Sequence, residues 1–390
     1  MLLLLSRNWQ DALDSGLDTL VIALDIAGAF DRVWHKGLLA KLQARGIRGD
    51  LLKLLENYMN GRTLQVVVGG QSSQHYPVKA GVPQGSVLGP LLWNIFIDDL
   101  LQQHPEISAY ADDSTLTTSY HRDDCMQVAE LVNAKLQSIK EWGTRWQVNF
   151  APEKTQAMVI SRSPTAATSM AQLLKMGNKP LPLLDNISIL GVNFDKELRF
   201  DDHIREICQI ASQKVSTLRR MACSLDAKGL LTLYNAQVRP YLEYSALSWL
   251  SSAPSHLSKL EKIQRRAINL VNNPLLTAKT DSLEHRRDVA ALTVLHKAQV
   301  QRVSHLDSLR LPPLTLRRST RTVPYHQLLV EVPRSRASQH LRTFSARTAR
   351  LWNMFIPTTD VTMMTTQQVK VAAHRWRRRL PSPIPALYYM

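Results

Sequence analysis

The stretch Ile107–Thr118, which reads Ile-Ser-Ala-Tyr-Ala-Asp-Asp-Ser-Thr-Leu-Thr-Thr, is the most informative part of this chain. Two adjacent carboxylates, Asp112 and Asp113, separate a short apolar run from a second run of strand-forming residues. This pattern predicts two strands joined by a tight turn, with both acids at its tip. Paired carboxylates on a rigid hairpin can bind hard divalent cations, which prefer oxygen ligands. A plain solvated turn is the competing interpretation, so the rest of the chain has to decide between them.

A third carboxylate, Asp25, lies at the end of another predicted strand. Residues 19–24 form a continuous apolar run of strand length, which suits a strand buried on both faces. The order of the other predicted elements gives a β-α-β-β-α-β layout, the α+β arrangement in which one antiparallel sheet is backed by helices. These elements are a small hairpin over 63–78, a strand over 156–160, and helices over 2–15, 34–45, 50–60, 88–101 and 122–142.

The predicted layout brings the three carboxylates together. The end of the first strand meets the tip of the hairpin, so Asp25 is expected beside Asp112 and Asp113. Because neighbouring strand residues face opposite sides of a sheet, a turn between Asp112 and Asp113 is needed to aim both acids inward. Three such carboxylates can hold two Mg²⁺ ions roughly 3.5–4 Å apart, which stabilise the attacking and leaving oxygens of a phosphoryl displacement.

The later part of the chain is predicted to be mainly helical. The helix expected at 122–142 carries apolar residues at spacings of three and four, which predict one buried stripe made of Cys125, Ala129, Val132, Leu136, Ile139 and Trp142. A strand pair or turn is expected over 186–194, and helical periodicity dominates from 203 to 300. A looser, Arg-rich tail begins at Leu311.

The chain is strongly basic, and the excess charge lies near the C-terminus. A formal net charge of +16 and a pI near 9.9 favour a polyanionic partner, nucleic acid first and an anionic membrane surface second. Residues 301–390 hold 15 Lys and Arg against 3 Asp and Glu. Arginine suits bidentate phosphate contacts, so a nucleic-acid surface and a solvated tail are equally good interpretations of one cluster: Arg375, Arg377, Arg378 and Arg379.

Cysteine usage and hydropathy point to the inside of the cell. The three cysteines form no metal-type spacing and leave an odd count, which suits free thiols in a reducing compartment. No apolar run of the sequence approaches the roughly 18 residues of a membrane span, so no membrane partner is expected. A cytoplasmic ribonucleoprotein and the nucleus both stay open as locations, because Arg clusters are a weak import signal.

Several motifs together resemble reverse transcriptases, and most closely those of non-LTR, LINE-type retrotransposons of the jockey-like group. The stretch Val21–Asp31 resembles the first palm motif of that family, and the Pro-Gln-Gly-Ser and Tyr-Ala-Asp-Asp strings resemble the second and third. All motifs occur in the family's order, and the resemblance covers nearly the whole chain. Those two strings lie in Gly81–Pro90 and Ala109–Asp113. Asn149–Thr155 resembles the fourth motif and Ile189–Val192 the primer-grip region, and two further matching stretches are Leu233–Tyr244 and Phe344–Pro357.

The resemblance implies a metal site and its ions. Asp25, Asp112 and Asp113 match the family's metal-binding triad, and Ile26 matches the residue whose backbone carbonyl also ligates metal. The implied ions are two Mg²⁺, with Mn²⁺ as an alternative. Lys154 matches the lysine that protonates or neutralises the leaving pyrophosphate.

The resemblance also implies a nucleotide pocket. Phe30 matches the bulky residue that closes the pocket against a ribose 2′-hydroxyl. Gln84 and Gly85 match the loop that touches the incoming nucleotide and the templating base, where glycine allows close backbone approach. Asp31 is offset from the motif positions and is interpreted as structural, as are Asp98 and Asp99.

By the same resemblance, residues 1–200 form the palm, 201–300 a helical thumb-like region, and 301–390 an Arg-rich, mostly helical C-terminal region. Only about 24 residues precede Asp25, so we expect an N-terminally truncated chain whose triphosphate-binding fingers are largely missing. An upstream endonuclease domain is expected to be absent as well.

Three functions fit these observations. The first is an RNA-directed DNA polymerase that uses an RNA template, a DNA primer and dNTPs. The second is a catalytically inactive remnant that binds RNA or DNA through its basic thumb and tail. The third is a scaffold that keeps only the fold. The presence of Asp25, Asp112, Asp113, Phe30 and Gln84 slightly favours a recently active ancestor and says nothing about present activity. The oligomeric state stays open.

Overall fold

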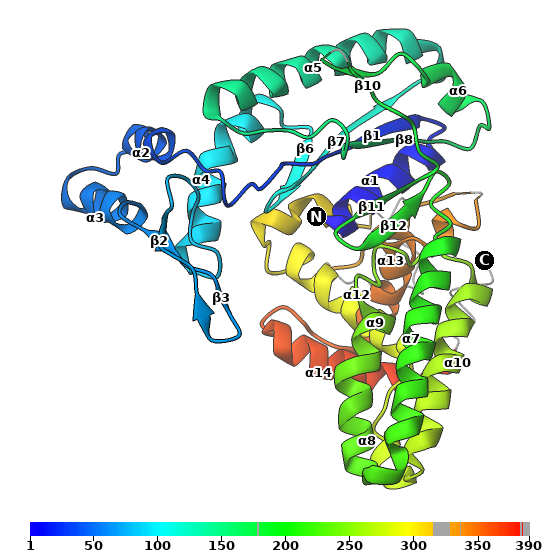
Figure 1. Cartoon of the computed structure of the whole chain (residues 1–390). Helices are drawn as coiled ribbons and strands as arrows, with labels where there is room; N and C mark the ends of the chain where they lie inside the picture. Colours follow the sequence, from blue (N-terminus) through cyan, green and yellow to red (C-terminus); the bar gives the residue numbers. More distant parts are fainter. Residues whose placement is uncertain (178, 315–327, 336, 383, 385–390) are drawn as a thin grey trace. The chain divides into compact units, whose positions relative to one another are not determined.

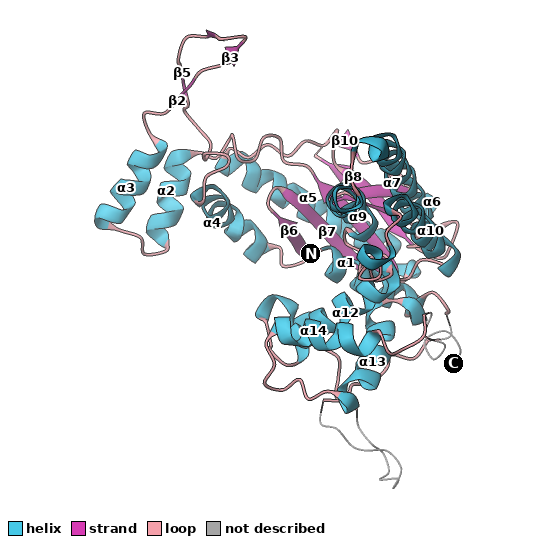
Figure 2. Ribbon diagram, turned by 90° about the horizontal axis from the view of Figure 1, so that it is seen from below, coloured by secondary structure: helices cyan, strands magenta, loops and turns pink. Residues whose placement is uncertain are grey.

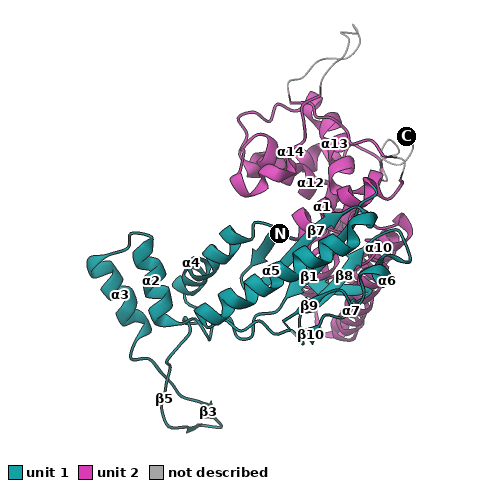
Figure 3. Cartoon of the chain, turned by 90° about the horizontal axis from the view of Figure 1, so that it is seen from above, with its two compact units in different colours: residues 1, 16–190 teal, residues 2–15, 191–390 magenta. Residues whose placement is uncertain are grey.

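The computed structural model describes residues 1–390 except 178, 315–327, 336, 383 and 385–390. The chain divides into two compact units, coloured separately in Figure 3. The first unit comprises Met1 and Gly16–Leu190, and the second comprises Leu2–Ser15 and Gly191–Met390. Each unit is described by itself below.

This division differs from the ranges expected from the sequence. The boundary falls after Leu190 instead of at 200, and the ranges 201–300 and 301–390 lie within one unit. Helix α1 (Leu2–Asp14) belongs to the second unit although it begins the chain. Local periodicity predicts a helix here but carries no information about which distant segment the helix packs against. Part of the expected Arg-rich region, 315–327 and 385–390, lies outside the described residues.

The first unit is built on a four-stranded antiparallel sheet. Its spatial order is β6-β7-β1-β8, and every neighbouring pair is antiparallel. The strand β1 therefore lies between the hairpin and the last strand. The four strands are β1 (Asp18–Leu24), β6 (Ile107–Tyr110), β7 (Asp113–Tyr120) and β8 (Gln156–Ile160).

Two long helices cover one face of this sheet. Alternate residues of β1, Leu20, Ile22 and Leu24, share a single hydrophobic core with apolar residues of α4 (Leu88–Gln103) and α5 (Cys125–Trp146). Helix α5 runs along this face in Figure 1. The stripe expected from the sequence is confirmed, because all six of its residues are buried. The helix itself begins later than expected, after a short turn, η1 (Arg122–Asp124).

The remaining elements of the first unit are short. Two helices and two small ribbons lie to one side of the sheet, as Figure 2 shows. The expected single hairpin over 63–78 is a pair of two-residue ribbons, β2 with β5 and β3 with β4. In chain order, the remaining elements of the first unit are α2 (His35–Ala44), α3 (Gly49–Met59), β2 (Thr63–Leu64), β3 (Val67–Val68), β4 (Gln71–Ser72), β5 (Tyr76–Pro77), α6 (Ala166–Met170), β9 (Lys175–Met176), β10 (Lys179–Pro180) and β11 (Asn186–Ile189).

The second unit is mainly helical. In it α7 packs on α10, and α12 packs on α13 and α14 around a core that includes Trp352 and Phe355. Within the described ranges of the chain, no helix is long and apolar enough to cross a membrane. The main elements are β12 (Val192–Asp195), α7 (Asp201–Met221), α8 (Ala227–Leu233), η3 (Tyr234–Val238), α9 (Arg239–Glu243), α10 (Pro254–Val271), α11 (Pro274–Thr277), α12 (Leu283–Gln299), α13 (Phe344–Phe355) and α14 (Thr366–Arg377), with the short turns η2 (Ala222–Ser224), η4 (Ser304–Leu309), η5 (His340–Arg342) and η6 (Ile356–Thr358).

Candidate active site

The strand register places Asp25 beside Asp113. The last pair in the β1–β7 ladder joins Leu24 to Ser114, and the next residue on each strand is Asp25 and Asp113, respectively. Residues opposite one another in an antiparallel pair point to the same face, with Cβ atoms about 4.5–5.5 Å apart. Both carboxylates lie on the face opposite the helical core, because Leu24 points into that core.

A tight turn presents the second acid of the hairpin. Tyr110 pairs with Asp113, so the turn residues are Ala111 and Asp112, and Asp113 is the first residue of β7. The expected turn between Asp112 and Asp113 therefore lies one residue earlier. Ala111 has a left-handed backbone, with φ of 55°, as primed two-residue hairpins require. Both acids are exposed.

A tryptophan on α4 holds this turn in position. The indole Nε1 of Trp93 donates a hydrogen bond of 2.7 Å to the carbonyl oxygen of Ala111. The Trp93 ring is fully buried in the helical core, so this hydrogen bond ties the acidic turn to that core. Sequence reasoning missed this residue because a tryptophan in an apolar helix looks like ordinary core.

The carboxylates create a site of unbalanced negative charge. Partial burial, together with the charges of Asp112 and Asp25, raises the pKa of Asp113 above its usual value. Oδ2 of Asp25 is shielded from solvent and accepts no hydrogen bond. Nζ of Lys154 lies 3.9 Å from this oxygen, beyond hydrogen-bonding distance. Neighbouring carboxylates that repel one another suit a divalent cation, which would relieve the repulsion.

The backbone at Ile26 is directed toward the hairpin. The chain 149–151 lies on the β8 side of β1, where Ala27 N donates to Asn149 O at 2.9 Å and Ala151 N donates to Asp25 O at 3.0 Å. Ile26 forms an antiparallel β-bridge with Phe150, and the two hydrogen bonds of this bridge are made by the neighbouring residues and not by the N–H or C=O of Ile26. In such a pair the N–H and C=O of the residue point away from the partner, so the Ile26 carbonyl faces the β7 side.

Lys154 reaches the site from the same segment that bridges Ile26. Its backbone N–H donates to the carbonyl oxygen of Ala151 at 3.1 Å, in a turn that leads into β8. The side chain is 66% exposed, so its ammonium group is accessible from solvent. The structure thus brings together Asp25, Ile26, Asp112, Asp113 and Lys154 in one unit.

Phe30, which is expected to contact the nucleotide, is linked to the acidic turn through Trp93. The half-buried ring of Phe30 packs against Trp93, with ring centroids 5.6 Å apart. Val82 N donates to Phe30 O at 2.7 Å, which ties the Gly81–Ser86 loop to the end of the first motif. Gly81 has a φ of 91° and approaches Asp31 so closely that a Cβ would lie 2.7 Å from its carbonyl oxygen.

Gln84 and Gly85 are exposed at the tip of this loop. The side-chain amide of Gln84 donates a 2.8 Å hydrogen bond to Oδ1 of Asp31. Asp31 therefore orients a residue expected to contact nucleotide, which agrees with its interpretation as structural. Gly85 has a φ of 76°, a conformation that L side chains rarely adopt, and no neighbouring atom lies within 4 Å of the position of a Cβ.

The four C-terminal arginines do not form one surface, and the expectation for Arg377 needs correction. Arg377 is 1% exposed, and its Nε donates to Oδ2 of the buried Asp288 at 2.8 Å. Arg378 pairs with Asp281, while Arg375 and Arg379 are exposed. A buried, paired guanidinium cannot reach a phosphate. Nucleic-acid contacts of Arg375, Arg378 and Arg379 stay a prediction.

Comparison with known proteins gives a family match for the first part of the chain. Residues 6–194 match the family model "Reverse transcriptase (RNA-dependent DNA polymerase)". That range contains the whole carboxylate site and the Gly81–Ser86 loop. Members of the family generally use divalent metal ions, nucleic-acid templates and nucleotide substrates.

Three of the curated relatives come from mobile elements of Drosophila melanogaster. The RNA-directed DNA polymerase from mobile element jockey is 27% identical over 82% of this chain. The probable polymerases from transposons X-element and BS are 30% and 27% identical over 64% and 69% of it, respectively. The chain spans 35%, 28% and 30% of the lengths of these three relatives. Residues 6–194 thus match the reverse transcriptase model, and the homologues of the chain include RNA-directed DNA polymerases of non-LTR retrotransposons.

Proposed function

We propose that this chain catalyses RNA-templated DNA synthesis by metal-dependent nucleotidyl transfer. The observation that carries the proposal is the register of β1 and β7, which sets Asp25 opposite Asp113 and leaves their charges unbalanced. In this proposal the first unit is the polymerase palm. The helical part of the second unit is the thumb, followed by a basic C-terminal region. An RNA template, a DNA primer and dNTPs are the partners.

The proposed cofactor is a pair of Mg²⁺ ions, with Mn²⁺ as an alternative. Asp25, Asp112, Asp113 and the backbone carbonyl of Ile26 would hold them. When bound, such ions neutralise negative charge on the triphosphate and on the two oxygens exchanged at phosphorus. The protein need not form covalent bonds to the substrate in phosphoryl transfer, so positioning and charge neutralisation account for most of the catalysis.

The other site residues act on the nucleotide. Lys154 places an exposed ammonium beside Asp25, where it neutralises or protonates the departing pyrophosphate. Gln84, oriented by Asp31, contacts the incoming nucleotide, and the bare backbone at Gly85 allows close approach of the base pair. Phe30 fills the space that a ribose 2′-hydroxyl would need.

Primer extension tests this function directly. We expect the full chain to extend an oligo(dT) primer on poly(rA) with dTTP when Mg²⁺ or Mn²⁺ is present. Excess EDTA should abolish the reaction, and returning the metal should restore it. A chain that binds the primer–template in both ions but extends nothing would overturn the proposal. That result would favour the nucleic-acid-binding remnant among the alternatives.

Phe30 gives a prediction about sugar selection. In an extending chain, replacing Phe30 with Ala should raise the use of rNTPs relative to dNTPs on the order of 10–100-fold, because the space beside the sugar is no longer filled. Competition between rNTP and dNTP in single-nucleotide extension measures this ratio. The variant Phe30→Tyr keeps the ring and its packing on Trp93, and should retain discrimination. Unchanged selection in Phe30→Ala would assign Phe30 to the core alone.

A further inference from the structure

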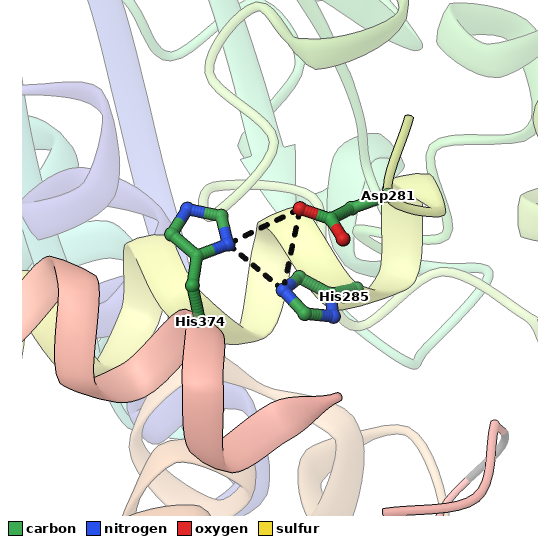
Figure 4. Close-up of side chains that lie close together, drawn as sticks. All are labelled: Asp281, His285 and His374. Carbon is green, nitrogen blue, oxygen red and sulfur yellow. Dashed lines mark hydrogen bonds and ion pairs between the residues drawn. The ribbon is translucent and has the colours of Figure 1, made fainter. Parts of the chain in front are cut away.

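Three side chains converge in the second unit, in a place that the polymerase site does not use. Asp281, His285 and His374 each aim one ligand atom at a common point, as Figure 4 shows. Nε2 of His285 lies 2.9 Å from Nδ1 of His374. Oδ2 of Asp281 lies 3.6 Å from that Nε2 and 3.3 Å from that Nδ1.

Local structure explains why these groups meet. Ser282 caps α12, where its hydroxyl accepts a hydrogen bond from the backbone N–H of His285. Asp281 and His285 are four residues apart, and they reach the same side of the first helical turn. His374 comes from α14, which packs along α12 within the same unit. The group therefore joins two helices that are far apart in the sequence.

The separations fit a tetrahedral metal site. Zinc binds His nitrogen and Asp oxygen at about 2.0–2.2 Å, so two ligand atoms of a tetrahedron lie about 3.3–3.6 Å apart. Two of the three separations, 3.3 and 3.6 Å, fall in that range. The third, 2.9 Å, is shorter by a few tenths of an ångström, a shift within reach of a side-chain rotation. A hydrogen bond between two neutral rings is the competing explanation of that contact.

Neighbouring groups hold the Asp281 ligand in place. Arg378 donates from Nε to Oδ1 of Asp281 at 3.0 Å and from Nη2 to Oδ2 at 3.2 Å. The amide of Gln264 donates to the backbone oxygen of Asp281. Such outer contacts orient metal-binding carboxylates in known sites.

The ligand atoms of this site differ from those of the hairpin that carries Asp112 and Asp113. Two imidazole nitrogens and one carboxylate oxygen suit Zn²⁺, whereas Mg²⁺ prefers oxygen alone. We propose that Asp281, His285 and His374 bind one Zn²⁺ ion, with water as the fourth ligand. The ion cross-links α14 to α12 and fixes the basic C-terminal helix within the second unit.

Zinc titration of the metal-free full chain tests this proposal. After chelator treatment, we expect one Zn²⁺ per chain in competition with a chromogenic zinc indicator. His374→Gln, which keeps a side chain of similar reach, should weaken binding at least about 100-fold, because outer-sphere changes alone cost 10–100-fold. The matched control is His305→Ala, which removes an exposed histidine of η4 and should leave the affinity unchanged. Equal affinity in the parent and His374→Gln would overturn the proposal.

Two further measurements distinguish zinc binding at this site from a loss of folding and from zinc binding by cysteines. Zinc should raise the thermal midpoint of the parent and of His305→Ala, and should not raise that of His374→Gln. Cobalt substitution should give visible d–d bands without the intense thiolate charge-transfer band that a cysteine site would produce. A thiolate band would assign the metal to cysteines and would also overturn the proposal.

Discussion

The Asp113→Asn variant should extend a DNA primer on RNA at least about 10²–10³-fold more slowly than the parent chain. That loss corresponds to removing one well-placed electrostatic group from a transition state. Asparagine keeps the shape of the side chain but removes the negative charge beside Asp25, just past the last pair of the β1–β7 ladder. Single-turnover extension at saturating primer–template and dNTP measures the chemical step.

The fold should survive this change, which separates chemistry from stability. The pKa of Asp113 is raised by burial and by two neighbouring acids, so its negative charge is unfavourable in the folded chain. Neutralising it should leave the thermal midpoint unchanged or slightly higher. The matched control is Asp123→Asn, an exposed acid of η1 in the same unit, which should keep full activity. Equal extension rates in Asp113→Asn and the control would refute the assigned role.

The Asp288→Ala variant should lose about 3–5 kcal/mol of unfolding free energy in the second unit, the usual cost of breaking a buried ion pair. Asp288 is 1% exposed and accepts hydrogen bonds from two arginines of other helices. Arg377 Nε donates to it at 2.8 Å, and Arg347 Nη2 at 2.8 Å. Removing the carboxylate leaves two buried guanidinium groups that share Glu284.

Urea unfolding followed by tryptophan fluorescence measures this effect as a lower midpoint. Asp307→Ala removes an exposed partner of Arg310 in the same unit and should change stability by less than about 0.5 kcal/mol. Arg377→Ala should be destabilising, whereas the exposed Arg379→Ala should not be. If Arg377→Ala weakened RNA binding at unchanged stability, the buried network described above would be wrong.

The order of apolar runs was enough to predict the main elements of the first unit. The strand at 156–160 has the bounds expected of it, and the stripe on α5 is buried as its spacing indicates. These features depend on local periodicity, which a sequence carries directly. The order of the predicted elements also placed the end of the first strand beside the hairpin, and β1 does pair with β7 up to Leu24 and Ser114.

Contacts between distant segments had to come from the tertiary structure. An arginine run looks equally basic in sequence whether its members are solvated or buried, and only the position of Asp288 shows that Arg377 is internal. From the sequence Trp93 looks like an ordinary core residue, and only the structure shows that its indole donates a hydrogen bond to the acidic turn. His285 and His374 are 89 residues apart, and no spacing pattern joins them. Charge and hydrophobicity are properties of single residues. Which residues contact one another depends on where the packing of helices and strands places their side chains.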